Sequence, residues 1–289
     1  MKYRFICEQR RFHSVEKMAR TLGVSRTGYY EWLRGQGSLR RSRDEGLVER
    51  IREIQEKVHY RYGSPRMSQE LARAGYRVGH NHVARLMREH QLGRRLRRRY
   101  RSTTRSDHNL PVAKNLVNRE FRVEASNRVW VSDITYVSTA EGWLYLCVVI
   151  DLYSRKVIGW AMSRRMKAAL VVQALIMALM RRGGPRQVTF HSDRGSQYAS
   201  DAVRGRLAQY GLKQSMSRKG DCWDNAPTES FFSTLKTELC GHRAFATRAE
   251  AQAAIFEYIE IFYNRVRLHS TIGYLTPAEY EEGSAQRAG

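Results

Sequence analysis

The order of strand and helix patterns after residue 128 limits the fold of this chain more than any other feature. Three strand-like runs come first, VWVSDITYV, WLYLCVVI and LYSRKVIGWAM, followed by a helical pattern, the strand QVTFHS, a second helical pattern, the short strand LKQSMS and a third helix. Apolar residues at period 2 predict strands, and spacings of three and four predict helices. The order predicts an α/β domain whose mixed five-stranded sheet begins antiparallel and continues parallel, with flanking helices.

Three acids stand out within this pattern. Asp133 lies inside the first strand, Asp193 ends the fourth, and Glu229 lies on the third helix, with 59 and then 35 residues between them. An acid inside a strand is costly unless it has a function. Carboxylates suit Mg²⁺, and two bridged ions can clamp an in-line phosphoryl displacement. A cap, a surface charge or an ion pair is the commoner role of a single acid, and the rivals are Asp151, Asp201, Asp221, Asp224 and Glu238.

The charge of the chain is strongly basic and uneven. Its 51 Lys and Arg against 28 Asp and Glu give a net charge of +23. Residues 1–110 hold 27 basic and 11 acidic side chains, net +16, and the remainder holds 24 and 17, net +7. Such an excess indicates a polyanionic partner, with nucleic acid as the first candidate. We therefore expect the front of the chain to bind DNA.

Residues 14–34 have the pattern of a helix-turn-helix. Ser14 can cap the first helix, Gly23 supplies the turn, and Ser25 can cap the second. Arg26, at the start of the second helix, is a candidate DNA contact. An ordinary helical hairpin is the alternative.

A second helical unit follows a small, polar, basic linker at residues 35–43. An amphipathic helix is predicted from Asp44, a second from the Ser64-Pro65 pair with Ser64 as its cap, and a third over residues 80–90. Arg85 and Arg88 face outward on the third helix, either as DNA contacts or as part of a solvated face.

Residues 94–109 cannot form a core. Seven arginines fall between positions 94 and 105, with few apolar residues. We expect a flexible basic linker that follows phosphates without sequence preference. Its candidate contacts are Arg94, Arg95, Arg97, Arg98 and Arg99.

The four cysteines form no CxxC pair, so neither a zinc module nor a disulfide framework is predicted. The N-terminal residues contain no apolar signal core, and the longest apolar run, 144–150, is too short to cross a bilayer. A cytoplasmic protein without membrane contact is expected.

Several motifs together resemble bacterial insertion-sequence transposases of the second-reading-frame (OrfB) type, in the DDE or retroviral-integrase superfamily. These are WVSDITYV, CVVIDLYSRKVIGWAM, HSDRGSQY, GDCWDNAPTESFFSTLK and the tail YNRVRLHSTIGYLTPAEY, together with the helical front. The similarity covers roughly residues 3–280, and the 35-residue gap before Glu229 matches the superfamily's D-35-E pattern. It implies an RNase H-like catalytic core preceded by small all-α DNA-binding units.

By this resemblance, Asp133, Asp193 and Glu229 are the catalytic acids and the metal ligands, for two Mg²⁺ or Mn²⁺ ions per site. Lys236, seven residues after Glu229, matches the family's basic DNA contact near the scissile phosphate. His191 and Asn225 lie in matched motifs, where a strand residue and a helix cap are the alternatives. No His/His/Cys/Cys set precedes the core, so no zinc is expected, and no nucleotide is needed.

The implied activity is metal-dependent cleavage at the element's ends followed by strand transfer to target DNA. A decayed transposase kept as a DNA-binding regulator is the alternative, and an RNase H-type hydrolase is a weaker one. The implied partners are double-stranded DNA at the element ends and the target, further copies of the chain on DNA, and an upstream-frame protein that is often fused to it. The expected domains are residues 1–40 (helix-turn-helix), 41–93 (second helical unit), 94–122 (basic linker), 123–245 (DDE core) and 246–289 (C-terminal helix and tail).

Overall fold

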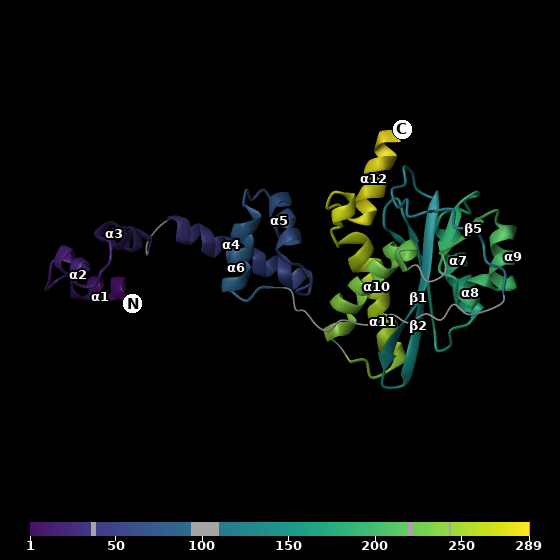
Figure 1. The fold of residues 1–289 in the computed structure, drawn as a ribbon, viewed down its shortest axis with the longest axis horizontal. Coiled ribbons are helices and arrows are strands. Elements are labelled where there is room, and N and C mark those ends of the chain that lie inside the picture. Colours follow the sequence, from purple (N-terminus) through teal and green to yellow (C-terminus); the bar gives the residue numbers. More distant parts are fainter. Residues whose placement is uncertain (36–38, 94–109, 219–221, 243, 289) are drawn as a thin grey trace. The chain divides into compact units, whose positions relative to one another are not determined.

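The computed structural model describes residues 1–35, 39–93, 110–218, 222–242 and 244–288. Contacts divide the chain into two compact units, Met1–Arg94 and Arg95–Gly289 (Figure 1). The first unit is helical, and the second contains the sheet. In the described ranges, no helix is long and apolar enough to cross a membrane.

The first unit begins with three short helices that bury one small cluster. They are α1 (Lys2–Gln9), α2 (Val15–Thr21) and α3 (Arg26–Gly35). The Lys17 N–H donates to the Ser14 hydroxyl at 3.3 Å, and Gly23 adopts a φ of 61° at the turn between α2 and α3. These are the two helices predicted over residues 14–34. Helix α1 was not predicted, and its Ile6 is fully buried in the same cluster.

The next three helices are α4 (Leu39–Lys57), α5 (Ser64–Arg73) and α6 (His80–Glu89). Buried Gln55 joins them by donating from Nε2 to the Tyr62 and Leu92 carbonyls at 2.8 and 2.7 Å.

Two predictions about these helices were wrong. Helix α4 begins at Leu39 within the expected linker, since five helix-compatible residues precede Asp44. The N-cap of α5 is Gly63 rather than Ser64, which already lies in the first turn.

The sheet of the second unit has the strand order β3-β2-β1-β4-β5. β1 pairs antiparallel with β2, and β2 antiparallel with β3, whereas β4 runs parallel to both β1 and β5. This confirms the predicted mixed sheet. The strands are β1 (Val129–Thr139), β2 (Gly142–Asp151), β3 (Val157–Ser163), β4 (Thr189–Ser192) and β5 (Lys213–Met216).

Helices cover both faces of this sheet. Figure 1 shows α7 (Ala168–Arg181), α8 (Ser196–Ala199) and α9 (Asp201–Gln209) on one side, and α10 (Ala226–Glu238) and α11 (Arg248–Glu257) on the other. The main core lies under α7 and includes Trp130, Leu175 and Phe190, all fully buried. Gly159 of β3 lies close to α7, where an added Cβ would come within 2.2 Å of the Ala174 carbonyl oxygen.

The third strand begins at Val157 rather than near Leu152, because residues 152–154 form a turn.

The end of the chain is more helical than expected. The expected helix after residue 246 is present as α11 followed by a π-helix, η3 (Tyr258–Tyr263), whereas α12 (Pro277–Ala288) lies in the tail, where no strong periodicity was found. The Glu281 carboxylate fixes α12 to the core by accepting from the Ser154 hydroxyl at 2.7 Å and from Lys156 at 2.8 Å. The short helices η1 (Cys222–Asn225), η2 (Cys240–His242) and η4 (Ser270–Ile272) complete the unit.

Candidate active site

The first two acids lie side by side where β4 ends. The last paired residues of the parallel β1–β4 ladder are Ser132 and Ser192, so Asp133 and Asp193 directly follow the same pair. Neighbouring strands are about 4.8 Å apart. β1 continues to Thr139 beyond this point without β4 beside it, and α10 packs against β1. The predicted adjacency of the two aspartates is therefore present.

Backbone groups orient both carboxylates. The Ile134 N–H donates to Asp133 Oδ1 at 2.7 Å, and the Gly195 N–H donates to Asp193 Oδ1 at 2.9 Å. A Cβ at Gly195 would lie 3.0 Å from Asp193 Oδ1, so a larger residue would crowd this carboxylate. Beneath the pair, the Ser132 hydroxyl lies 2.8 Å from the buried Tyr198 hydroxyl, which ties β1 to α8.

The electrostatics of the site disfavour two ionised carboxylates side by side. Burial raises the pKa of Asp133 well above its usual range, and repulsion from Asp193 and Glu229 adds to the shift. The Ile134 N–H and the positive charge of Lys236 act in the opposite direction. A raised acid pKa beside a second acid is typical of functional sites, because a purely structural position has no need of this cost.

Helix α10 carries the other two predicted residues. Pro227 occupies its first turn and Asn225 is its N-cap. Glu229 is exposed, and partial desolvation raises the pKa of its carboxyl. Lys236 is half-buried with its Nζ 5.0 Å from the centre of the Tyr136 ring, and burial lowers its pKa.

Asp193, Glu229 and Lys236 all act electrostatically on Asp133, so these four residues lie in one region. Among the residues that the structure describes, however, no three His, Cys, Asp or Glu side chains lie close enough together to hold a metal ion. The structure thus brings Asp133 and Asp193 side by side after the last β1–β4 pair, and it shows no complete three-acid metal site among the described residues.

Four of the five rival acids have structural partners, and the fifth, Asp221, lies outside the described residues. Fully buried Asp151 accepts from the Asn127 and Tyr153 N–H groups and pairs with Arg182 at 3.3 Å. Buried Glu238 pairs with Arg267 at 3.0 Å. Asp201 lies in the first turn of α9 and pairs with Arg204, and Asp224 is held by two arginines.

His191 is a buried strand residue rather than an exposed catalytic base. Its Nδ1 lies 2.8 Å from the Ser215 hydroxyl and its Nε2 lies 3.0 Å from the Asp224 carbonyl oxygen. Burial lowers the pKa of this imidazole, which favours its neutral form. Asn225 is the N-cap of α10, but in the described part of the chain its side chain makes no capping hydrogen bond.

The predicted DNA contacts of the first unit have different surroundings. Arg85 donates to Glu89 at 2.6 Å and to Asp44 at 2.9 Å, so part of its charge is neutralised within the unit. Arg26 lies 4.0 Å from Glu16, and Arg88 is exposed. Arg94, Arg95, Arg97, Arg98 and Arg99 lie outside the described residues.

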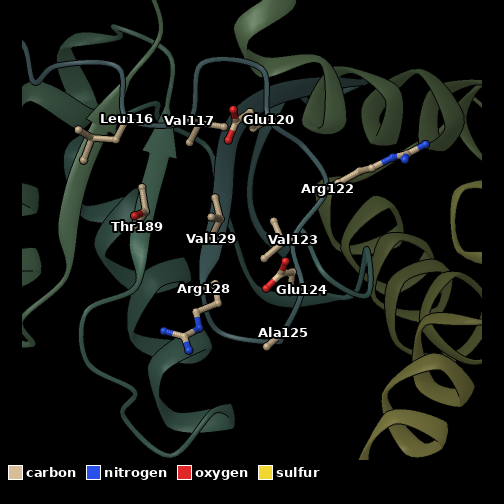
Figure 2. Close-up of a pocket in the computed structure, with 10 residues that line it drawn as sticks. All are labelled: Leu116, Val117, Glu120, Arg122, Val123, Glu124, Ala125, Arg128, Val129 and Thr189. Atoms are coloured by element: carbon tan, nitrogen blue, oxygen red, sulfur yellow. The ribbon is translucent and has the colours of Figure 1, made fainter.

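A cavity of about 390 Å³ lies at the other end of the same strands. Figure 2 shows Val129 and Thr189, the first residues of β1 and β4, at its wall together with Glu120, Glu124 and Arg128. It is thus formed where these strands begin, whereas Asp133 and Asp193 lie where their pairing ends. The predicted acids do not line it.

Sequence comparisons identify the class of this site. A model of the integrase core domain matches residues 123–222, a second integrase core model matches residues 229–284, and a model of an HTH-like domain matches residues 42–100. Between them, the two core models contain Asp133, Asp193 and Glu229. The second unit is accordingly an integrase-type, RNase H-like core, and the first contains a DNA-binding helical domain.

Full-length relatives define the family. An IS600 insertion-element protein of 31 kDa from Shigella sonnei is 47% identical over 94% of this chain and all of its own length. The transposase InsF of IS3A from Escherichia coli K12 is 42% identical over 97% of this chain and 98% of its own length. A simian T-cell lymphotropic virus intasome chain is 15% identical, with a TM-score of 0.47 over 80% of this chain and 74% of that chain.

The chain belongs to the IS3 family of insertion-sequence transposases. It is a DDE-type polynucleotidyl transferase that binds DNA, which confirms the resemblance found in its motifs. The alternative of an RNase H-type hydrolase is not supported by these relatives.

Proposed function

We propose that this chain cleaves the ends of its own insertion sequence and joins the freed strands to target DNA, with Asp133, Asp193 and Glu229 as its catalytic acids. The observation that carries this assignment is the adjacency of Asp133 and Asp193 after the last β1–β4 pair. Arginines pair with three of the rival acids, Asp151, Asp224 and Glu238.

The acids fit a divalent metal by their chemistry. Carboxylate oxygens are the ligands that Mg²⁺ and Mn²⁺ prefer, and a cation held by these acids would offset the repulsion that adds to burial in raising the pKa of Asp133. We propose two such ions per site, held by Asp133, Asp193 and Glu229, with neither zinc nor a nucleotide. Bound there, they would lower the pKa of water and neutralise charge at the phosphate.

The chain's own groups would position the DNA. Lys236, held beside the Tyr136 ring, supplies a cation next to the acids for the phosphate that flanks the scissile bond. Hydrolysis breaks a P–O3′ bond and leaves a 3′-hydroxyl. That hydroxyl then attacks a target phosphate, forming one P–O bond as another breaks, so no external energy source is needed.

We also propose which parts of the chain bind DNA and with which partners the chain acts. Residues 1–110 would supply preference for the element's ends, and residues 94–105 would add salt-sensitive binding to any DNA. Several copies would assemble on the DNA within the bacterial nucleoid, and an upstream-frame protein, separate or fused, would be a further partner.

The test of the proposed function is cleavage of DNA that carries both element ends. With Mg²⁺ or Mn²⁺, the full chain, alone or fused to the upstream product, should nick at the ends and leave 3′-hydroxyls. DNA of the same length with scrambled ends is the control. End binding without cleavage by either form would support the decayed regulator instead.

A truncation starting at Leu110 tests the division of labour. It keeps the whole core and should fold, but it should bind end DNA and scrambled DNA equally in a competition assay. Retained preference for end DNA would contradict the assignment of end recognition to residues 1–110.

A further inference from the structure

Asp224, five residues before Glu229, has an environment that neither a helix cap nor a surface acid would need. Its side chain is fully buried. It accepts at least five hydrogen bonds: from Asn115 Nδ2 at 2.9 Å, Arg119 Nε at 3.1 Å, and the Arg218 N–H, Nε and Nη2 at 2.9, 3.1 and 2.9 Å. The N-cap of α10 is Asn225, so capping does not explain this arrangement.

The donors come from two distant parts of the chain. Arg218 follows β5, and Asn115 and Arg119 belong to residues 113–121, which we call the 113–121 segment. This segment is held on the core by further bonds, since the Leu116 N–H donates to the Ser215 hydroxyl at 2.9 Å and Arg155 donates to the Phe121 carbonyl at 3.0 Å. Asp224 therefore joins β5, the 113–121 segment and the start of α10.

The backbone of Asp224 extends this connection to β4. Its carbonyl oxygen can only accept, so the neutral His191 imidazole donates from Nε2 at 3.0 Å. Nδ1 is then an acceptor for the Ser215 hydroxyl at 2.8 Å, and that hydroxyl in turn accepts from Leu116. Each polar group in this chain of bonds has a partner in a consistent direction.

The connection joins the two elements next to which predicted ligands lie, β4 before Asp193 and the start of α10 with Glu229. His191 lies two residues before Asp193 on β4, and Asp224 lies five residues before Glu229, within the 3₁₀ turn that leads into α10. Any shift of Asp224 would move the first turn of α10 relative to the end of β4. The bonds at Asp224 thus act on the start of the helix that carries the third predicted ligand, Glu229.

We propose that Asp224 is a positioning residue: its buried carboxylate, held by Arg119 and Arg218, fixes the start of α10 and so sets the position of Glu229 relative to Asp133 and Asp193. The inference rests on the proposed function, in which Glu229 is a metal ligand. It assigns Asp224 no contact with metal or DNA.

Mn²⁺ affinity, measured on the full chain by electron paramagnetic resonance, tests this without turnover. Groups that orient ligands typically contribute roughly 10- to 100-fold to metal affinity. We expect Asp224→Asn to weaken Mn²⁺ binding within that range, and Arg119→Gln, which removes one of the five bonds, to weaken it less. Asp151→Asn is the matched control, because Asp151 is equally buried and arginine-paired but acts on other elements.

The double variant Asp224→Asn/Glu229→Gln separates positioning from general damage. If Asp224 acts through Glu229, the double variant should bind Mn²⁺ no more weakly than Glu229→Gln alone. Added weakening in the double variant, or equal Mn²⁺ affinity in Asp224→Asn and the unchanged protein, would overturn the proposal. Should Asp224→Asn fail to fold, the same comparison of Mn²⁺ affinities is made with Arg119→Gln, alone and combined with Glu229→Gln, and it tests the proposal in the same way.

The proposed function fails by a different result. A chain that binds Mn²⁺ but never cleaves end DNA would refute catalysis, while the Mn²⁺ cycle would still support or overturn the role of Asp224. A chain whose Mn²⁺ affinity is unaffected by Glu229→Gln would refute both, since Glu229 would then not be a ligand.

Discussion

Asp133 and Asp224 are carboxylates near the end of β4 in opposite electrostatic settings. Asp133 has Asp193 beside it, and its pKa is raised by burial and by this repulsion. Asp224 lies against two guanidinium groups, and hydrogen bonds from Arg218 hold its pKa well below the usual range. An acid matched by cations stabilises the folded chain. Two ionised acids side by side lower stability by repulsion, and a functional site can tolerate this loss if a cation binds there.

The largest expected effect is on catalysis. Asp133→Asn, Asp193→Asn and Glu229→Gln each keep the shape of the side chain but remove an anionic ligand, so cleavage and joining should fall by several orders of magnitude. DNA binding should persist, because it depends on basic residues elsewhere. Strand cleavage and gel-shift assays on the same preparations measure the two properties.

Asp151→Asn and Asp201→Asn serve as the controls for these variants, since both acids have structural partners. Near-normal cleavage by Asp193→Asn, together with loss of cleavage in a folded Asp151→Asn protein, would show that the wrong acid was chosen.

The second-largest expected effect is on the free energy of unfolding, through an acid that is buried with an arginine partner. Arg267 and Glu238 form a buried pair at 3.0 Å, and the Tyr258 hydroxyl donates to the same carboxylate at 2.9 Å. Arg267→Met should leave the Glu238 charge buried and unmatched, which lowers the free energy of unfolding by about 3–5 kcal/mol. Urea denaturation measures this change. Arg181→Met, at a more exposed pair with Glu260, should cost less than about 1 kcal/mol, and equal losses would contradict the distinction.

A smaller expected effect is the pH dependence of the stability that Asp224 contributes. Because its folded pKa is depressed, Asp224 stabilises the fold above its usual pKa of 3.8, and this contribution is lost as pH falls below that value. Asp224→Asn should cost about 1–3 kcal/mol at pH 7, the range for hydrogen bonds to a charged group. The loss relative to the unchanged protein should shrink as pH falls from 4 towards 2. A difference that stays constant over this range in denaturation curves would show that the Asp224 charge contributes little.

The comparison also shows what the sequence can predict. The strands beside the aspartates were predictable because their apolar patterns are local, visible as alternation in VWVSDITYV and as a continuous apolar run in WLYLCVVI. The choice of the three acids rested on the resemblance, since spacing alone did not separate them from Asp151 or Glu238. The sheet could be predicted in outline because each strand carries its own pattern.

Features that depend on distant contacts were not predictable. Asp224 was considered as a rival catalytic acid or a helix cap, and its role in joining distant segments could not be predicted, because its partner Asn115 is 109 residues away along the chain. Helix α12 depends on Glu281, whose bond to Ser154 spans 127 residues, and its own sequence has weak periodicity. The position of Glu229 follows from the packing of α10 on β1 and from the bonds at Asp224, neither of which leaves a local pattern.

The smallest expected effect has the opposite sign and tests the comparison most directly. A folded pKa above the unfolded value means that the folded chain binds more protons, so Asp133 lowers stability as pH rises from about 4 through its raised pKa. Without divalent metal, Asp133→Asn should therefore slightly raise the free energy of unfolding at pH 7, because the neutral amide removes a charge that burial and the neighbouring acids disfavour. Mn²⁺ should reverse the order by stabilising only the unchanged protein. Thermal unfolding with and without Mn²⁺ measures both changes. If Asp133→Asn instead destabilises the metal-free protein as Asp224→Asn does, then Asp133 is one more structural acid, and the contrast between these two carboxylates does not hold.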